Sequence, residues 1–99
     1  DIIDTGGTIA AASRALIERG AKSVSVAATH GIFSDESVEK LKDTPIEEIV
    51  VTDTLKQNGN IEKIGNVNIL SVSSIIATAL TSIFADDSVS AIFMGENVL

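Results

Sequence analysis

The residues best suited to chemistry lie at the start of the chain, where two acidic residues precede a short loop of threonines and glycines. Two adjacent glycines allow a tight loop to bring its backbone amides close to a ligand. The helix expected next adds unpaired N–H groups and the positive end of its dipole, a combination that suits a phosphate group. Threonine hydroxyls can donate further hydrogen bonds, and carboxylates can accept them from sugar hydroxyls. The candidate binding residues are Asp1, Asp4, Thr5, Gly6, Gly7 and Thr8.

A simpler interpretation treats Thr5 to Thr8 as a flexible turn in which Thr8 caps a helix. The neighbouring carboxylates argue against it, because acidic groups beside a phosphate are costly unless they bind hydroxyls or a magnesium ion. We therefore favour a phosphosugar site, with the loop around the phosphate and Asp1 and Asp4 on the hydroxyl side.

Alternating helices and strands are expected to position this loop. Helix formers, caps and breakers predict helices over residues 8–19, 34–41 and 73–85. Alternating and β-branched segments predict strands over residues 23–29, 48–52 and 67–72. His30 and Gly31 are expected to form a turn, and residues 55–65 a polar loop around Asn58-Gly59-Asn60. The apolar segment Val89 to Met94 is either another strand or a segment packed on further structure.

This order of elements predicts crossover connections and an α/β fold with a mainly parallel sheet flanked by helices. Such sheets bind ligands beyond the carboxyl ends of their strands. With 99 residues, of which 44% are hydrophobic, the chain has the size of one domain.

Two helix faces are expected to be buried. Residues 67–85 hold no charged side chain, but their apolar residues fall on one side at helical spacing, which predicts a helix resting on a soluble core and not a membrane span. The apolar side of that helix comprises Val72, Ile76, Ala79, Leu80 and Ile83. In the first helix, Ile9, Ala12 and Leu16 are expected to face the core, with Ala15 beside them.

Composition excludes several functions. The chain has no cysteine and one histidine, so neither a disulfide framework nor a structural zinc site is expected. Fourteen acidic residues against seven basic ones give a net charge of −7, which would repel nucleic acid. No segment reads as a secretory signal, so a cytoplasmic protein is expected.

Residues 1–8, Asp-Ile-Ile-Asp-Thr-Gly-Gly-Thr, resemble the phosphoribosyl pyrophosphate (PRPP) motif of type I phosphoribosyltransferases and PRPP synthases. Further matching segments follow in the order seen in PRPP synthases, so the resemblance covers nearly the whole chain: Arg19 to Lys22, Ala28 to Ser34, Val50 to Thr54 and Ser88 to Phe93. It implies an incomplete type I phosphoribosyltransferase-like fold, with residues 1–99 as a carboxyl-terminal domain and the amino-terminal ATP-binding half upstream.

By that resemblance, Thr5, Gly6, Gly7 and Thr8 wrap the 5-phosphate of ribose 5-phosphate, and Asp1 and Asp4 hold its ring hydroxyls. The family reaction, that of a ribose-phosphate diphosphokinase, transfers the diphosphoryl group of ATP to the C1 hydroxyl and gives PRPP and AMP. It uses Mg²⁺, and the enzymes assemble as homo-oligomers, either dimers or hexamers. Without the ATP-binding half, the chain is expected to bind ribose 5-phosphate weakly and to make no PRPP.

Two alternatives remain open: a nucleobase phosphoribosyltransferase, and a non-catalytic regulatory protein associated with a synthase. The intact carboxylates and glycine pair argue against a purely regulatory copy. His30 follows a predicted strand, where ligands bind, although a structural role is the more common one for a single histidine. Asp35, Glu36 and Glu39 are expected to serve a helix dipole and not a metal ion.

Overall fold

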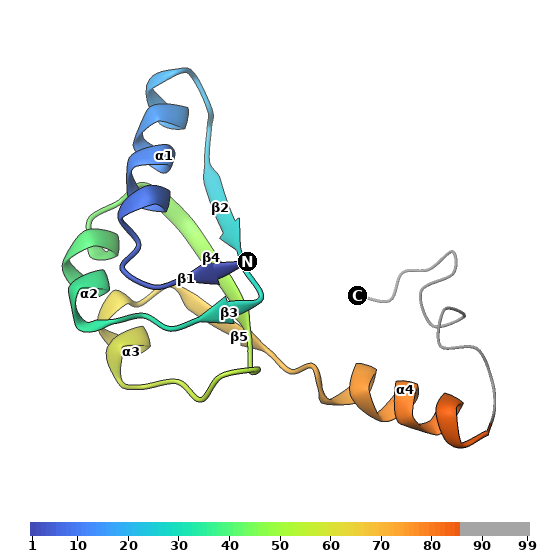
Figure 1. The fold of residues 1–99 in the computed structure, drawn as a ribbon. Coiled ribbons are helices and arrows are strands. Elements are labelled where there is room, and N and C mark those ends of the chain that lie inside the picture. The colour runs from blue at the N-terminus through green and yellow to red at the C-terminus, as the bar shows by residue number, and fades with distance from the viewer. Residues whose placement is uncertain (86–99) are drawn as a thin grey trace.

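The computed structural model describes residues 1–85 of the chain (Figure 1). Its strands are β1 (Ile2–Ile3), β2 (Val24–Ala27), β3 (His30–Gly31), β4 (Ile46–Thr52) and β5 (Val67–Leu70). Its helices are α1 (Gly7–Glu18), α2 (Asp35–Lys42), α3 (Asn60–Ile64) and α4 (Ser73–Phe84). The apolar segment Val89 to Met94 lies outside the described residues.

All the strand pairings within residues 1–85 are parallel, which confirms the predicted α/β class with helices flanking parallel strands. The strands form two sheets: β1 pairs with β3, and β4 lies between β2 and β5. Helices α1, α2 and α3 each lead into a strand, as parallel connections require. In the larger sheet Ile49 lies opposite Val26 on one side and Val67 on the other.

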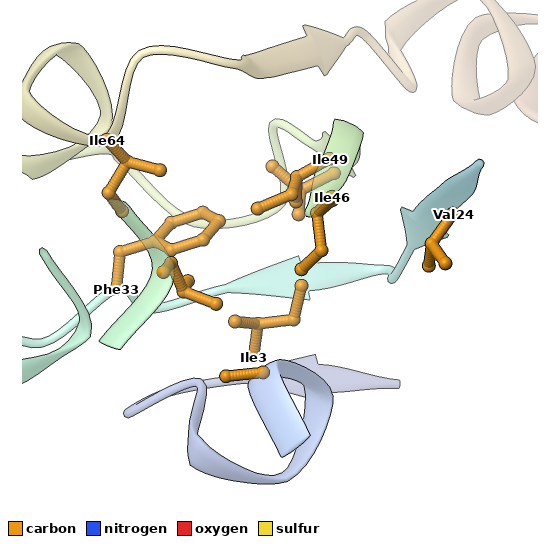
Figure 2. Packing of buried hydrophobic residues seen from close by; sticks show 9 residues of the cluster. Ile3, Val24, Phe33, Ile46, Ile49 and Ile64 are labelled. Atoms are coloured by element: carbon orange, nitrogen blue, oxygen red, sulfur yellow. The ribbon is translucent and has the colours of Figure 1, made fainter. Parts of the chain in front are cut away.

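One apolar cluster joins the sheets to the helices. Figure 2 shows side chains from β1, β2, β4, α3 and the segment after β3 meeting in this core. Along β4, Ile49 and Val51 are fully buried, whereas Val50 between them is only half-buried and Glu48 before them is exposed. This alternation is expected of a strand with one covered face. The buried cluster consists of Ile3, Ala10, Val24, Phe33, Leu41, Ile46, Ile49, Val51 and Ile64.

Helices α1, α2 and α3 form the covering layer, with α2 in contact with both of the others. Helix α1 buries Ala10 and Ser13, and Ile9 packs partly buried against the core. The prediction that Leu16 and Ala12 face the core was wrong, because Leu16 is 50% exposed and Ala12 is also exposed. The inner stripe consists of small residues instead, so hydrophobicity alone assigned the face incorrectly.

Helix α4 has the predicted bounds to within one residue but not the predicted packing. None of its residues is buried, and in Figure 1 it extends away from the sheets. Ile76, Leu80 and Ile83 are 53%, 50% and 59% exposed, so the prediction that this face rests on the core was wrong for residues 1–85. Periodicity predicts that a helix has an apolar face, but it does not identify what covers that face.

Two short elements replace segments predicted to be irregular. The expected turn at His30 and Gly31 is β3, which pairs with β1. The expected loop over residues 55–65 contains the five-residue helix α3, whose Asn60 and Ile64 are both buried. A turn signal at Asn58-Gly59-Asn60 is compatible with a helix that begins at its last residue, so the local pattern did not distinguish the two structures.

Candidate functional site

The candidate site is the connection between β1 and α1 together with the first two residues of α1; these residues, 4–8, are called the phosphate loop below. Gly6 precedes the first helical residue and adopts a left-handed backbone conformation, with φ at 81°. No side chain caps α1, so the interpretation of Thr8 as a capping residue was wrong. Gly6 turns the chain into the helix and leaves the first-turn amides open to a ligand.

A cavity of about 210 Å³ at this helix start is lined by residues 2–9, which include the first residues of α1. The N–H groups of Gly7 and Thr8 donate to no backbone or side-chain acceptor within residues 1–85. The first bond of the helix runs from the Ala10 amide to the Gly6 carbonyl, at 2.9 Å. Unpaired donors at a helix start, next to a cavity, provide the partial positive charge that an anion requires.

The two glycines differ in how closely other side chains pack against them. A Cβ on Gly6 would lie 2.7 Å from Leu41 Cγ, so the loop can approach α2 this closely only without a side chain. A Cβ on Gly7 would meet atoms only at 3.7 Å or beyond, which is ordinary contact. Gly6 is therefore required by the fold, whereas a side chain at Gly7 would be tolerated by its protein neighbours.

Lys40 of α2 brings a cationic side chain to this loop, which the sequence did not indicate. Its Nζ lies 3.7 Å from the position that a Cβ on Gly7 would occupy. The ammonium group also pairs with Glu36, at 3.1 Å, and the Lys40 side chain is 43% exposed. A lysine in the last turn of a predicted helix has no local feature that marks it as a ligand-binding residue, because the contact depends on how α2 packs.

The two predicted carboxylates lie in different surroundings. Asp4 is exposed and lines the same cavity as Thr5 to Thr8. Asp1 lies instead in a neighbouring groove, formed with the carboxyl ends of β2 and β4. The structure thus brings Asp4 and the threonine and glycine residues around one cavity, with Asp1 beside it and not in its lining.

His30 and Thr54 form a polar pair, with 2.6 Å between His30 Nδ1 and Thr54 Oγ1. Thr52 also donates through its hydroxyl to the Thr29 carbonyl, at 2.6 Å. These contacts connect β3 and the residue before it to the end of β4 and the residues after it. A structural partner therefore exists for the single histidine.

A second, more polar cavity of about 500 Å³ lies at the other end of the larger sheet. Its lining includes Glu47, Glu48, Asn66 and Asn68, close to the amino ends of β4 and β5. Parallel sheets bind ligands at the carboxyl ends of their strands, which is where the phosphate loop follows β1. We therefore regard the smaller cavity as the candidate site.

The described residues offer no metal centre of their own. Within residues 1–85, no group of three or more acidic or histidine side chains is arranged to hold a metal ion. Across the same residues, no helix combines the length and the apolar character needed to cross a membrane.

Comparison with curated proteins shows similarity to ribose-phosphate pyrophosphokinases. The chain is 46% identical over 93 residues to a ribose-phosphate pyrophosphokinase of Buchnera aphidicola subsp. Acyrthosiphon pisum, covering 94% of the chain and 30% of that protein. It is 46% identical over 96 residues to that of Corynebacterium glutamicum, covering 97% of the chain and 29% of that protein. The chain therefore spans about 30% of the length of these curated relatives.

A solved structure is similar as well. The crystal structure of phosphoribosylpyrophosphate synthetase from Mycobacterium smegmatis matches with a TM-score of 0.77 and 39% identity, over 87% of this chain and 28% of that one. Residues 1–94 match the family described as the phosphoribosyl synthetase-associated domain. Since that match extends over nearly the whole sequence, the chain belongs to the phosphoribosyl synthetase-associated domain family.

Proposed function

We propose that this chain is the carboxyl-terminal, substrate-holding part of a ribose-phosphate pyrophosphokinase, and that the phosphate loop binds the 5-phosphate of ribose 5-phosphate. The main support is the cavity beside the unpaired amides of Gly7 and Thr8. The similarity to ribose-phosphate pyrophosphokinases supports the class of enzyme. Because the chain spans about 30% of those relatives, the complete reaction requires the remainder of such an enzyme.

The proposed roles follow from the positions of the groups. The amides of Gly7 and Thr8 and the hydroxyls of Thr5 and Thr8 donate to phosphate oxygens. Lys40 adds a positive charge near the cavity and offsets the repulsion between the phosphate and Asp4. Asp4 then accepts from a ribose hydroxyl, and Asp1 does so from the neighbouring groove.

In the complete enzyme, the C1 hydroxyl of the bound sugar attacks the β-phosphorus of ATP, and AMP leaves. Magnesium would neutralise charge on the transferred diphosphoryl group. Magnesium is often held by one or two carboxylates together with substrate phosphates and water, so the absence of a metal cluster within residues 1–85 is compatible with this reaction. The role of the described residues is to hold and orient the sugar phosphate.

Substitution at Gly7 tests the phosphate contact. Gly7→Ala should leave the fold intact, because the new Cβ meets only ordinary contacts, but it should weaken ribose 5-phosphate binding about tenfold by narrowing access to the amides. Gly59→Ala is the matched control, because its Cβ would also meet only an ordinary contact, 3.9 Å from Glu62 Oε2. Calorimetric titration measures the affinity, and thermal unfolding measures the stability of each variant.

Substitution at Asp4 separates the sugar contact from the phosphate contact. Asp4→Asn should weaken the binding of ribose 5-phosphate but not that of inorganic phosphate, because only the sugar offers hydroxyls to the carboxylate. Asp43→Asn, an exposed acidic residue at the end of α2, is the control for net charge. If wild-type chain bound neither ligand, or if amide resonances of residues 5–8 did not respond to ribose 5-phosphate, the proposal would be wrong.

A further inference from the structure

The segment after β3 contains a strained residue, Phe33, whose neighbour Ser34 is hydrogen-bonded to the first residue of the phosphate loop. Phe33 has φ at 50°, the left-handed region that residues other than glycine rarely adopt. Its ring is fully buried in the core. Strained backbone persists only where the surrounding structure holds it, so the contacts on both sides of Phe33 must fix this conformation.

One side of the turn at Phe33 is held by three side-chain amides from the segment after β4. These are Gln57, Asn58 and Asn60, and they are called the amide clamp. The amide groups of Asn58 and Asn60 both donate to the Phe33 carbonyl, at 3.2 and 2.9 Å. Gln57 donates to the Gly31 carbonyl at 2.9 Å. These contacts connect residues at least 25 positions apart in the chain.

Asn60 is the central member of the clamp. It is 5% exposed, and its Nδ2 also donates to Asp35 Oδ1 at 3.0 Å. Its backbone amide donates to Asn58 Oδ1 at 2.8 Å, which orients the second amide of the pair. A buried asparagine with its donors used in this way has little freedom to reorient.

The other side of the turn bonds to the beginning of the phosphate loop. The amides of Ile32 and Phe33 both donate to the Ile3 carbonyl, at 2.7 and 3.3 Å. The backbone amide and the hydroxyl of Ser34 donate to the Asp4 carbonyl, at 3.2 and 3.3 Å. The turn is thus bonded to the two residues that immediately precede the threonine and glycine residues of the loop.

From these contacts we infer that Asn58 and Asn60 are positioning residues for the phosphate loop. Their amides fix the Phe33 carbonyl, Ile3 fixes the Phe33 amide, and together these bonds hold Phe33 in its left-handed conformation. That conformation aims Ser34 at Asp4 and sets where the first-turn amides of α1 lie. The inference rests on the proposed function, because it assigns the clamp a role in binding the sugar phosphate.

The test replaces the Asn60 donor while keeping its size. Asn60→Asp removes the amide that donates to the Phe33 carbonyl and should weaken ribose 5-phosphate binding about tenfold. It should also shift the amide resonances of Gly6 and Gly7 in the unliganded chain. Asn66→Asp is the matched control, because Asn66 Nδ2 also donates to a backbone carbonyl, that of Ile46, at 2.7 Å, but away from the loop.

A double variant distinguishes positioning from a merely structural role. In Asn60→Asp with Asp35→Asn, the side-chain pair can bond again with donor and acceptor exchanged, while the Phe33 carbonyl keeps the Asn58 donor but still lacks the one that Asn60 supplied. We expect this exchange to recover stability but not affinity. Recovery of wild-type affinity by the exchange would overturn the inference, as would wild-type affinity in Asn60→Asp itself.

Further measurements keep the two proposals separable. Asn58 is exposed, so Asn58→Ala should fold even if Asn60 variants do not, and it should reduce the affinity severalfold. If the wild-type chain binds neither ribose 5-phosphate nor inorganic phosphate, the proposed function fails. The resonances of Gly6 and Gly7 then decide the inference alone: unchanged positions in both Asn60→Asp and Asn58→Ala would overturn it.

Discussion

Helices α1 and α4 are each 12 residues long, and both begin without a side-chain cap, yet their surroundings differ. Helix α1 contacts β2 and α2 and buries two small residues. Helix α4 is more apolar on average but buries none of its residues within the described part of the chain. Isolated helices of this length are marginal in water, so helix stability depends mainly on what the apolar face contacts.

The difference identifies the part of the chain that can support a binding site. The phosphate loop packs against α2 and is hydrogen-bonded to the turn at Phe33, and both of these belong to the packed layer. Helix α4 begins beyond the end of β5 and, in the described residues, contributes no side chain to that layer. Substitutions in the two regions should therefore have unequal effects.

The largest expected difference is in the free energy of unfolding, when the same substitution is made in both regions. Ile49→Ala should lower the free energy of unfolding by about 2 to 5 kcal/mol, because Ile49 is fully buried in the core. Ile83→Ala should change it by less than about 0.5 kcal/mol, because Ile83 is 59% exposed. Urea denaturation followed by circular dichroism measures both. Equal losses would show that α4 is packed in solution.

Glycine substitutions within the packed region give the next largest effect. Gly6→Ala should destabilise the chain by about 2 to 4 kcal/mol, because a left-handed φ is combined with a clash against Leu41. Gly20→Ala shares the positive φ but meets no atom within 4 Å, so it should lose only about 1 to 2 kcal/mol. The difference between the two melting temperatures isolates the contact with α2, and identical melting temperatures would contradict that contact.

A smaller effect concerns charge in the packed layer. Lys40→Gln should weaken ribose 5-phosphate binding by roughly threefold to tenfold, because it removes the cation near Gly7. Lys42→Gln removes the same charge from the same exposed helix turn and is the control. The difference should shrink in high salt, which screens an exposed charge. If both variants bound equally at low salt, Lys40 would have no specific role.

The smallest expected effect lies where α4 begins. The Val72 amide donates to Asp53 Oδ1 at 3.0 Å, and this bond, with a second one from the Ser71 side chain, lowers the pKa of the Asp53 carboxyl below its ordinary value. A lowered folded-state pKa stabilises the fold above the unfolded-state pKa, and this contribution is lost as pH falls through the lowered value.

Acidification below about pH 3.9 should therefore loosen the start of α4 before it affects α1. Carbon NMR of the Asp53 carboxyl measures its pKa, and the Val72 amide resonance reports on the bond. Asp53→Asn should remove this pH dependence while leaving the α1 resonances unchanged. A normal pKa for Asp53 would contradict the bond.

Much of the fold followed from local pattern. Strands β2, β4 and β5 and helices α1, α2 and α4 lie where alternation, helix formers and breakers predicted them. Helix α3 was missed because its five residues are too few to show a clear helical period, and tertiary contacts of Ile64 stabilise it instead. The inner face of α1 was missed because small residues pack there in place of larger apolar ones.

The candidate site likewise contains residues that the sequence indicated and residues that only the structure identified. The threonine and glycine residues of the phosphate loop form a contiguous motif, so sequence was sufficient to propose them. Lys40 and the amide clamp reach the loop or the turn beside it from far along the chain. Their roles depend on how helices and turns pack, which no local spacing records. Longer-range side-chain contacts were the part that required the structure.

Ala10 and Ser13, on the inner side of α1, offer a way to alter the site without touching a ligand-binding residue. Because their side chains are small and buried, they allow the axis of α1 to lie close to the neighbouring elements. A bulkier residue at either position would tilt the axis outward and carry the first-turn donors with it. Under the proposed function, side-chain volume at these two positions would set the affinity for a sugar phosphate from a distance.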